Sequence, residues 1–149
     1  MPDLVGELIG WRAWTVERVG PVIRLCSVIR RELNVWPVDR FMVATCEARR
    51  SSDDHGDIPG TECSCGIYAA RDRDSLLELE YGSFLSTADA DMRVMGEVAL
   101  SGLVVPGEWG WRSARARVHS LQIPYSAWRL AEKLTAYRVP IALGNPFKH

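Results

Sequence analysis

Lysine is almost missing from this chain. Its 149 residues include 16 arginines but only Lys133 and Lys148, and the 19 acidic residues bring the net charge to −1. A chain this close to neutrality has no overall field that would attract nucleic acid or an anionic membrane. The arginine excess favours either a surface that binds carboxylate or phosphate in a planar, bidentate way or, the simpler interpretation, the codon bias of a GC-rich genome.

Long apolar runs and targeting signals are also missing. No segment approaches the roughly 18 apolar residues of a membrane span, and residues 1–14 lack the basic start, apolar core and cleavage site of a secretory signal. We therefore expect a cytoplasmic protein without membrane contact, in which thiols stay reduced. The chain has no glycine-rich phosphate loop, nucleophile elbow or paired zinc-peptidase histidines, so an enzyme is less expected than a binding protein.

Composition and length predict one globular domain. Hydrophobic residues make up 47% of the chain and charged residues 25%, as is usual for a soluble fold. No repeat, low-complexity tract or linker divides the sequence, so we expect residues 1–149 to form a single domain.

Short apolar runs and alternating patterns predict mostly β-structure, with turns at glycine and proline. A hairpin is expected around Glu17–Pro21, and a second connection runs through Pro106–Gly110. The predicted strands are Trp11–Val16, Val22–Ile29, Phe41–Thr45, Cys65–Ala70, Met92–Val105 (with breaks or bulges at Gly96 and Gly102) and Trp111–Leu121.

Two helices are predicted. A short one at Ser75–Leu79 follows two aspartates, which favour a helix N-terminus. The other, Tyr125–Tyr137, places Ala127, Leu130, Ala131 and Leu134 on one apolar stripe and ends before Pro140. The sequence thus predicts an α+β fold: a curled antiparallel sheet or small open barrel of roughly five to seven strands, a short middle helix, a C-terminal amphipathic helix and a zinc-pinned loop.

Three of the four cysteines lie between residues 46 and 65. Together with one histidine they form the pattern Cys46-x8-His55-x7-Cys63-x-Cys65, a ligand set that tetrahedral zinc accepts. On an extended chain the last two thiols would lie roughly 6–7 Å apart, whereas zinc holds its sulfurs within about 4 Å of each other. The chain must therefore curl at Ser64, and Gly66 would help it to do so. We expect a structural zinc ion.

Other interpretations of this loop stay open. Its thiols could be buried without metal, with His55 incidental, and a disulfide is the less favoured choice in a reducing compartment. A catalytic thiol would need a base and an orienting group, for which His55 and Asp53 or Asp54 could serve. Three closely spaced thiols favour ligation over catalysis, because zinc-bound thiolates are less available for attack.

A Gly-Trp-Arg sequence occurs twice, as GWRAW at residues 10–14 and as GWRSARA at residues 110–116. An exposed Trp/Arg pair would suit base stacking or an interface hot spot. The favoured alternative is that each tryptophan anchors the core while its arginine faces water. Of the aromatic residues, Trp109, in a glycine-flanked turn, is the one for which exposure is most expected.

A basic stripe is predicted on the last long strand. Arg115, Arg117 and His119 share one face by period-two spacing, with Arg112 nearby. The stripe could bind phosphate, but a solvated face paired with Glu97 or Glu108 is the commoner outcome. With Trp109, these four residues form the candidate binding surface of the sequence.

Several of these segments together resemble a family of small proteins from actinobacteria and their phages that has no assigned activity. The segments are GWRAW, Trp36-Pro37, Cys46, CSCGIYA at 63–69, GEVALSGLVV at 96–105 and GWRSARA. The likeness spans about residues 10–120, and Cys-Gly-Ile-Tyr is its most specific part. Ser101 stands where the family more often has tryptophan. The resemblance implies a bacterial or phage origin and a shared cysteine loop.

The sequence therefore predicts a non-catalytic intracellular binding protein that engages a protein partner and carries structural zinc. The first alternative is a small β-barrel that binds nucleic acid through its arginine and tryptophan residues. The second alternative is a thiol-dependent enzyme.

Overall fold

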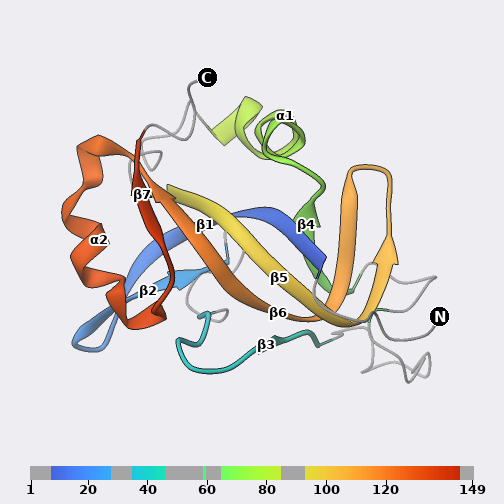
Figure 1. Ribbon diagram of the computed structural model, residues 1–149, viewed down its shortest axis with the longest axis horizontal. Coiled ribbons are helices and arrows are strands. Elements are labelled where there is room, and N and C mark those ends of the chain that lie inside the picture. Colours follow the sequence, from blue (N-terminus) through green and yellow to red (C-terminus); the bar gives the residue numbers. More distant parts are fainter. Residues whose placement is uncertain (1–7, 28–34, 46–58, 60–64, 85–92, 145–149) are drawn as a thin grey trace.

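The computed structural model describes residues 8–27, 35–45, 59, 65–84 and 93–144. Seven strands and two short α-helices make up this part of the chain, so the fold is α+β with β-structure dominant (Figure 1). The strands are β1 (Leu8–Val19), β2 (Val22–Cys26), β3 (Met42–Val43), β4 (Ile67–Ala70), β5 (Arg93–Pro106), β6 (Gly110–Ile123) and β7 (Ile141–Leu143). The helices are α1 (Arg73–Phe84) and α2 (Arg129–Lys133), the latter between 3-10 turns at Tyr125–Ala127 and Thr135–Tyr137.

The seven strands form one strongly curled sheet. β1 pairs with β5 along residues 8–15 and with β2 along residues 15–19, and β5 pairs in turn with β6. β4 pairs with β6 over four residues and touches β1 at one pair, Trp11 opposite Ala70. β4 therefore lies between the two long strands that carry the Gly-Trp-Arg segments.

The edge of β6 that pairs with β4 also pairs with two other strands. β3 pairs with Ala116 and Arg115, and β7 runs parallel to residues 121–123. This parallel pair makes the sheet mixed and corrects the expectation of a purely antiparallel sheet. The C-terminal segment returns after the α2 region, so β7 reaches the sheet in the same direction as β6 (Figure 1).

The main core fills the inside of the curl. Its centre is the pair Trp14 and Trp36, both fully buried, whose rings meet edge to face with centroids 5.4 Å apart. A second, smaller apolar cluster joins Ala13, Ala70, Leu76 and Met95 and lies beneath α1. The sheet thus buries apolar residues on both faces, in agreement with the view in Figure 1, where α1 covers one side of it.

Local sequence explains where α1 begins. Asp72 precedes the helix, and its Oδ1 accepts a hydrogen bond from the main-chain N–H of Ser75 at 2.8 Å, which is an N-cap. The N–H and hydroxyl of Ser75 lower the pKa of Asp72 because they stabilise its carboxylate. The helix continues to Phe84, well beyond the predicted Ser75–Leu79.

The predicted helix Tyr125–Tyr137 is not continuous. It consists of a 3-10 turn, the five residues of α2 and a second 3-10 turn. Leu134 is fully buried, and Tyr137 is 5% exposed. In a 3-10 turn, side chains three residues apart are eclipsed, so the tighter turn directs both Leu134 and Tyr137 into the core.

Candidate functional site

The two Gly-Trp-Arg segments flank β4. Trp11 of β1 lies opposite Ala70, and Trp111 of β6 lies opposite Ala69. Both glycines allow a close approach of backbones: a Cβ on Gly10 would lie 2.7 Å from the Ala69 Cβ, and a Cβ on Gly110 would lie 2.0 Å from the Ala69 carbonyl oxygen. The repeated sequence therefore marks the two contacts that hold β4 in the sheet.

The arginines of the same segments bind main-chain carbonyl groups. Arg12 Nη1 donates to the Tyr68 carbonyl oxygen at 2.7 Å, and Arg112 Nη1 donates to the Cys65 carbonyl oxygen at 2.8 Å. Arg12 also lies over the Trp36 ring, with its Cζ 5.0 Å from the centroid. The expectation that these arginines simply face water is wrong, because Tyr68 of β4 and Cys65, two residues before the strand, present carbonyl oxygens to the two guanidinium groups.

A cavity of about 660 Å³ runs along β4. Aromatic and small residues are prominent in its lining, and mostly apolar linings are typical of binding sites. Four tryptophans (Trp11, Trp36, Trp109 and Trp111), together with Tyr68, Arg12 and Arg112, are among its lining residues. Trp109 and Tyr68 are 44% and 50% exposed, so the rim of the cavity is an accessible aromatic surface.

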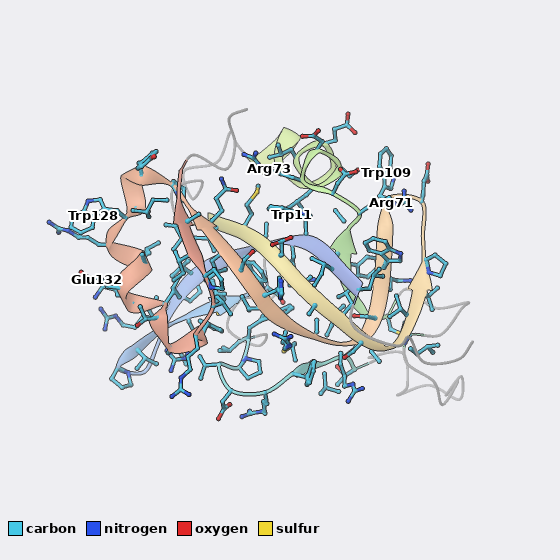
Figure 2. The ribbon with its side chains drawn as sticks, viewed as in Figure 1. Trp11, Arg71, Arg73, Trp109, Trp128 and Glu132 are labelled. Carbon is cyan, nitrogen blue, oxygen red and sulfur yellow. The ribbon has the colours of Figure 1, made fainter. Side chains whose placement is uncertain are left out.

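The tip of the β5–β6 hairpin provides one side of the rim. Gly107, Glu108 and Trp109 all line the cavity there. The Gly107 N–H donates to the Gly110 carbonyl at 2.8 Å, which closes the turn, and the Arg71 N–H donates to the Trp109 carbonyl at 3.0 Å. These bonds tie the turn to the chain that follows β4 (Figure 2).

The structure places some of the binding residues predicted from the sequence in the cavity and the others elsewhere on the surface. Trp109 and Arg112 both line the cavity. Arg115 lies over the Phe41 ring, at 5.3 Å from its centroid, and Arg117 borders a separate cavity of about 290 Å³ beside Tyr137. His119 is exposed on the same strand face as Arg115. The stripe is therefore next to the aromatic cavity in sequence but does not contribute to its wall.

Sequence reasoning did not assign Tyr68 or Arg71 to a site. Tyr68 alternates with the buried Ile67 and Ala69 along β4, so period-two spacing could have placed it on an outward face. Arg71 follows the strand directly and had no distinguishing pattern. Its role depends on the β5–β6 turn, which is distant in sequence.

Most of the predicted metal site lies outside the described residues. This applies to Cys46, His55 and Cys63; of the four ligands only Cys65 is described. Within the described ranges, no group of three or more histidine, cysteine, aspartate or glutamate side chains could hold a metal ion. Gly66 follows Cys65 with φ of +119°, a conformation that glycine adopts readily, whereas Ser64, where the curl is predicted, lies outside the described residues.

The two ends of the cysteine-containing segment meet on β6. The Ala44 N–H donates to the Ala114 carbonyl at 2.8 Å, and Ile67 pairs with Ser113. Pro59, the one described residue of the interval, is buried, and its Cβ would lie 2.9 Å from a Cβ on Gly66.

In comparisons with known proteins, no protein-family model, curated protein or solved structure matches the chain. Across the residues that the structure describes, no helix combines the length and apolar character needed to cross a membrane.

Proposed function

We propose that this chain is a non-catalytic binding protein of bacterial or phage origin, and that it holds a segment of a protein partner in the aromatic cavity along β4. The observation that carries the proposal is the cavity itself, about 660 Å³ in volume, with Trp109 and Tyr68 accessible at its rim. Cavities that bind ligands have volumes of roughly 300–1,000 Å³ and mostly apolar walls.

The chemistry of the wall favours a protein segment. Tryptophan, tyrosine and arginine are the residues most enriched at the energetic centres of protein interfaces. Trp11 and Trp111 are half-buried and rest on packed core clusters, so their rings lose little freedom on binding. Such a preformed aromatic surface suits a large apolar side chain of the partner.

The nucleic-acid alternative has less support from the geometry. Binding along a phosphate backbone needs a row of cationic side chains that follows the strand. In the cavity wall, Arg12 and Arg112 already donate to main-chain carbonyl groups, and Arg115 and Arg117 are directed to other parts of the surface. An aromatic cavity without such a row favours a protein partner.

The proposal predicts peptide binding that depends on Trp109. A display library of short random peptides, selected against the whole protein, should yield sequences that share one large apolar residue. Trp109→Ala should weaken the best peptide at least tenfold, measured by fluorescence anisotropy, because truncation of an aromatic hot-spot residue costs about 2 kcal/mol or more.

Trp128→Ala is the matched control. Trp128 is also exposed, at 51%, but lies on the α2 side, away from the cavity (Figure 2), so this variant should bind the peptide as the wild type does. Equal weakening by both variants, or an empty selection, would contradict the proposal. Retardation of an oligonucleotide that weakens steeply between about 50 and 200 mM salt would favour the alternative.

We also propose, from the sequence, that Cys46, His55, Cys63 and Cys65 hold a structural zinc ion. Two observations support this proposal: the ends of the segment meet on β6 at Ser113 and Ala114, and Gly66 turns the chain directly after Cys65. Zinc would close a long polar segment onto the edge of the sheet and supply no chemistry to the cavity.

Elemental analysis of the purified protein should show about one zinc per chain. Cys63→Ser should lower both the zinc content and the melting temperature, since binding energy at a structural site is also folding energy. Cys26→Ser should leave the zinc content unchanged, because Cys26 is buried within β2. Protein that contains no zinc and keeps its full thermal stability would end the proposal.

A further inference from the structure

Arg71 is not itself part of the cavity lining, but it contacts three residues that are: Gly107 and Glu108 of the β5–β6 turn and Trp111 of β6. Its guanidinium Cζ lies 5.8 Å from the centroid of the Trp111 ring. Nη2 and Nη1 face the carbonyl oxygens of Gly107 and Glu108 at 3.2 and 3.4 Å. Figure 2 shows Arg71 beside Trp109 at this end of the molecule. The side chain is exposed but positioned by an aromatic face and two carbonyl groups.

These contacts leave hydrogen-bonding capacity on Arg71. A guanidinium group carries five N–H donors, and the two carbonyl contacts are long. Among the described residues, no carboxylate lies within ion-pair distance of Arg71. The nearest acid in sequence, Asp72, directs Oδ1 to the Ser75 N–H at 2.8 Å; hydrogen bonds from Ser75 are the main reason that the pKa of Asp72 is lowered, and the charge of Arg71 adds to the effect. An arginine that is positioned in this way and exposed to solvent is suited to an acceptor from outside the chain.

Arg71 adds a positive charge beside the cavity, next to Trp111. Among the described residues of the lining, Arg12 and Arg112 already donate to main-chain carbonyl groups, and Glu108 is the one acidic side chain. One positioned guanidinium suits a single carboxylate, which it can bind through two parallel hydrogen bonds.

We infer that Arg71 determines the specificity of the cavity by binding a carboxylate of the partner segment while an adjacent large apolar side chain enters the aromatic wall. The inference rests on the proposed function. Because Arg71 stacks on Trp111, which lines the cavity, the carboxylate lies about one or two residues from the apolar anchor at roughly 3.4 Å per residue. An aspartate or glutamate side chain or the C-terminal carboxylate of the partner would each satisfy Arg71.

The experiment uses the whole protein and the peptides selected by display. Selected sequences should be enriched in an acidic residue next to the apolar anchor. Arg71→Gln should weaken their binding roughly tenfold, as expected for loss of a charged hydrogen bond, and Arg71→Glu should weaken it further. The matched control is Arg129→Glu, because Arg129 stacks on Trp128 at 5.3 Å in the same manner, on the α2 side.

Changes in the peptide test the same contact without altering the protein. Replacing the acidic residue by its amide should weaken binding to the wild type but not to Arg71→Gln. If Arg71 binds the terminal carboxylate, amidation of the peptide C-terminus should instead weaken binding to the wild type and leave binding to Arg71→Gln unchanged. These two arms distinguish the sources of the carboxylate.

The outcomes separate this inference from the proposed function. Peptides that lose affinity with Trp109→Ala but bind Arg71→Glu as tightly as wild type would overturn the role of Arg71 and leave the binding cavity in place. Equal effects of Arg71→Glu and Arg129→Glu would also overturn it, because a general charge effect would explain both. Failure to select any peptide would remove the proposed function itself.

Discussion

Gly110→Ala should lower the free energy of unfolding by about 3 kcal/mol or more, near the upper end of the range for overpacking. An added Cβ would lie 2.0 Å from the Ala69 carbonyl oxygen and 2.8 Å from the Ala70 Cα. Both atoms belong to the backbone of β4, so no side-chain rotation can relieve the overlap. β4 would have to move away from β6, which also breaks the wall of the cavity. Urea unfolding followed by tryptophan fluorescence measures the loss.

Gly107→Ala is the control for this prediction. Gly107 lies in the same hairpin turn, but a Cβ there would meet only the Gly110 carbonyl oxygen, at 3.8 Å, an ordinary contact. The change in unfolding free energy should stay within about 0.5 kcal/mol, as for most surface substitutions. If the two alanine variants were equally stable, β4 could not be packed against Gly110 as described.

Tyr137→Phe should destabilise the protein by about 2–4 kcal/mol. The buried Tyr137 hydroxyl accepts a hydrogen bond from the Leu25 N–H at 2.9 Å and donates one to the Trp36 carbonyl oxygen at 2.8 Å. Removing the hydroxyl leaves a buried donor and a buried acceptor without a partner, at about 1–3 kcal/mol each. Tyr125→Phe, at a 67% exposed position, should change the unfolding free energy little.

The pH dependence of stability provides an independent check on Tyr137. Burial raises its pKa from 10.0 to about 12, so above pH 10 the unfolded chain loses this proton before the folded one does. The resulting stabilisation is complete below pH 10 and falls as the pH rises toward 12, by roughly 2–3 kcal/mol in all. Tyr137→Phe should lack this decline. An identical pH profile in both proteins would show that the hydroxyl is accessible to water.

Local pattern predicted a large part of the fold. The β1–β2 hairpin forms around Gly20, whose φ is +62°. A turn of this kind can be predicted from the few residues that form it, because glycine adopts positive φ without steric cost. The long strands β5 and β6 form as predicted, with irregular pairing between Ser101 and Val104 where Gly102 has positive φ. Each of these features depends on neighbours in sequence.

The features that local pattern did not predict all depend on distant contacts. β7 became a strand because Ile141 pairs with Leu121. The C-terminal helix is interrupted because Leu134 and Tyr137 pack into a core built by β1, β2 and β6. An amphipathic stripe indicates which residues will be buried. It cannot indicate that the helix changes to a 3-10 turn, in which the Tyr137 hydroxyl meets the Leu25 N–H.

The candidate site shows the same division. The sequence alone identified the two Gly-Trp-Arg segments, the accessible Trp109 and the cysteine-rich segment as the unusual parts of this chain. Only the tertiary structure decided what the first two do. Inserting β4 between β1 and β6 brings Arg12 to the Tyr68 carbonyl across 56 residues, and it places Arg71 over Trp111 at the hairpin turn. Strand order and register determine such contacts, and they depend on how the whole chain packs, so no single segment encodes them.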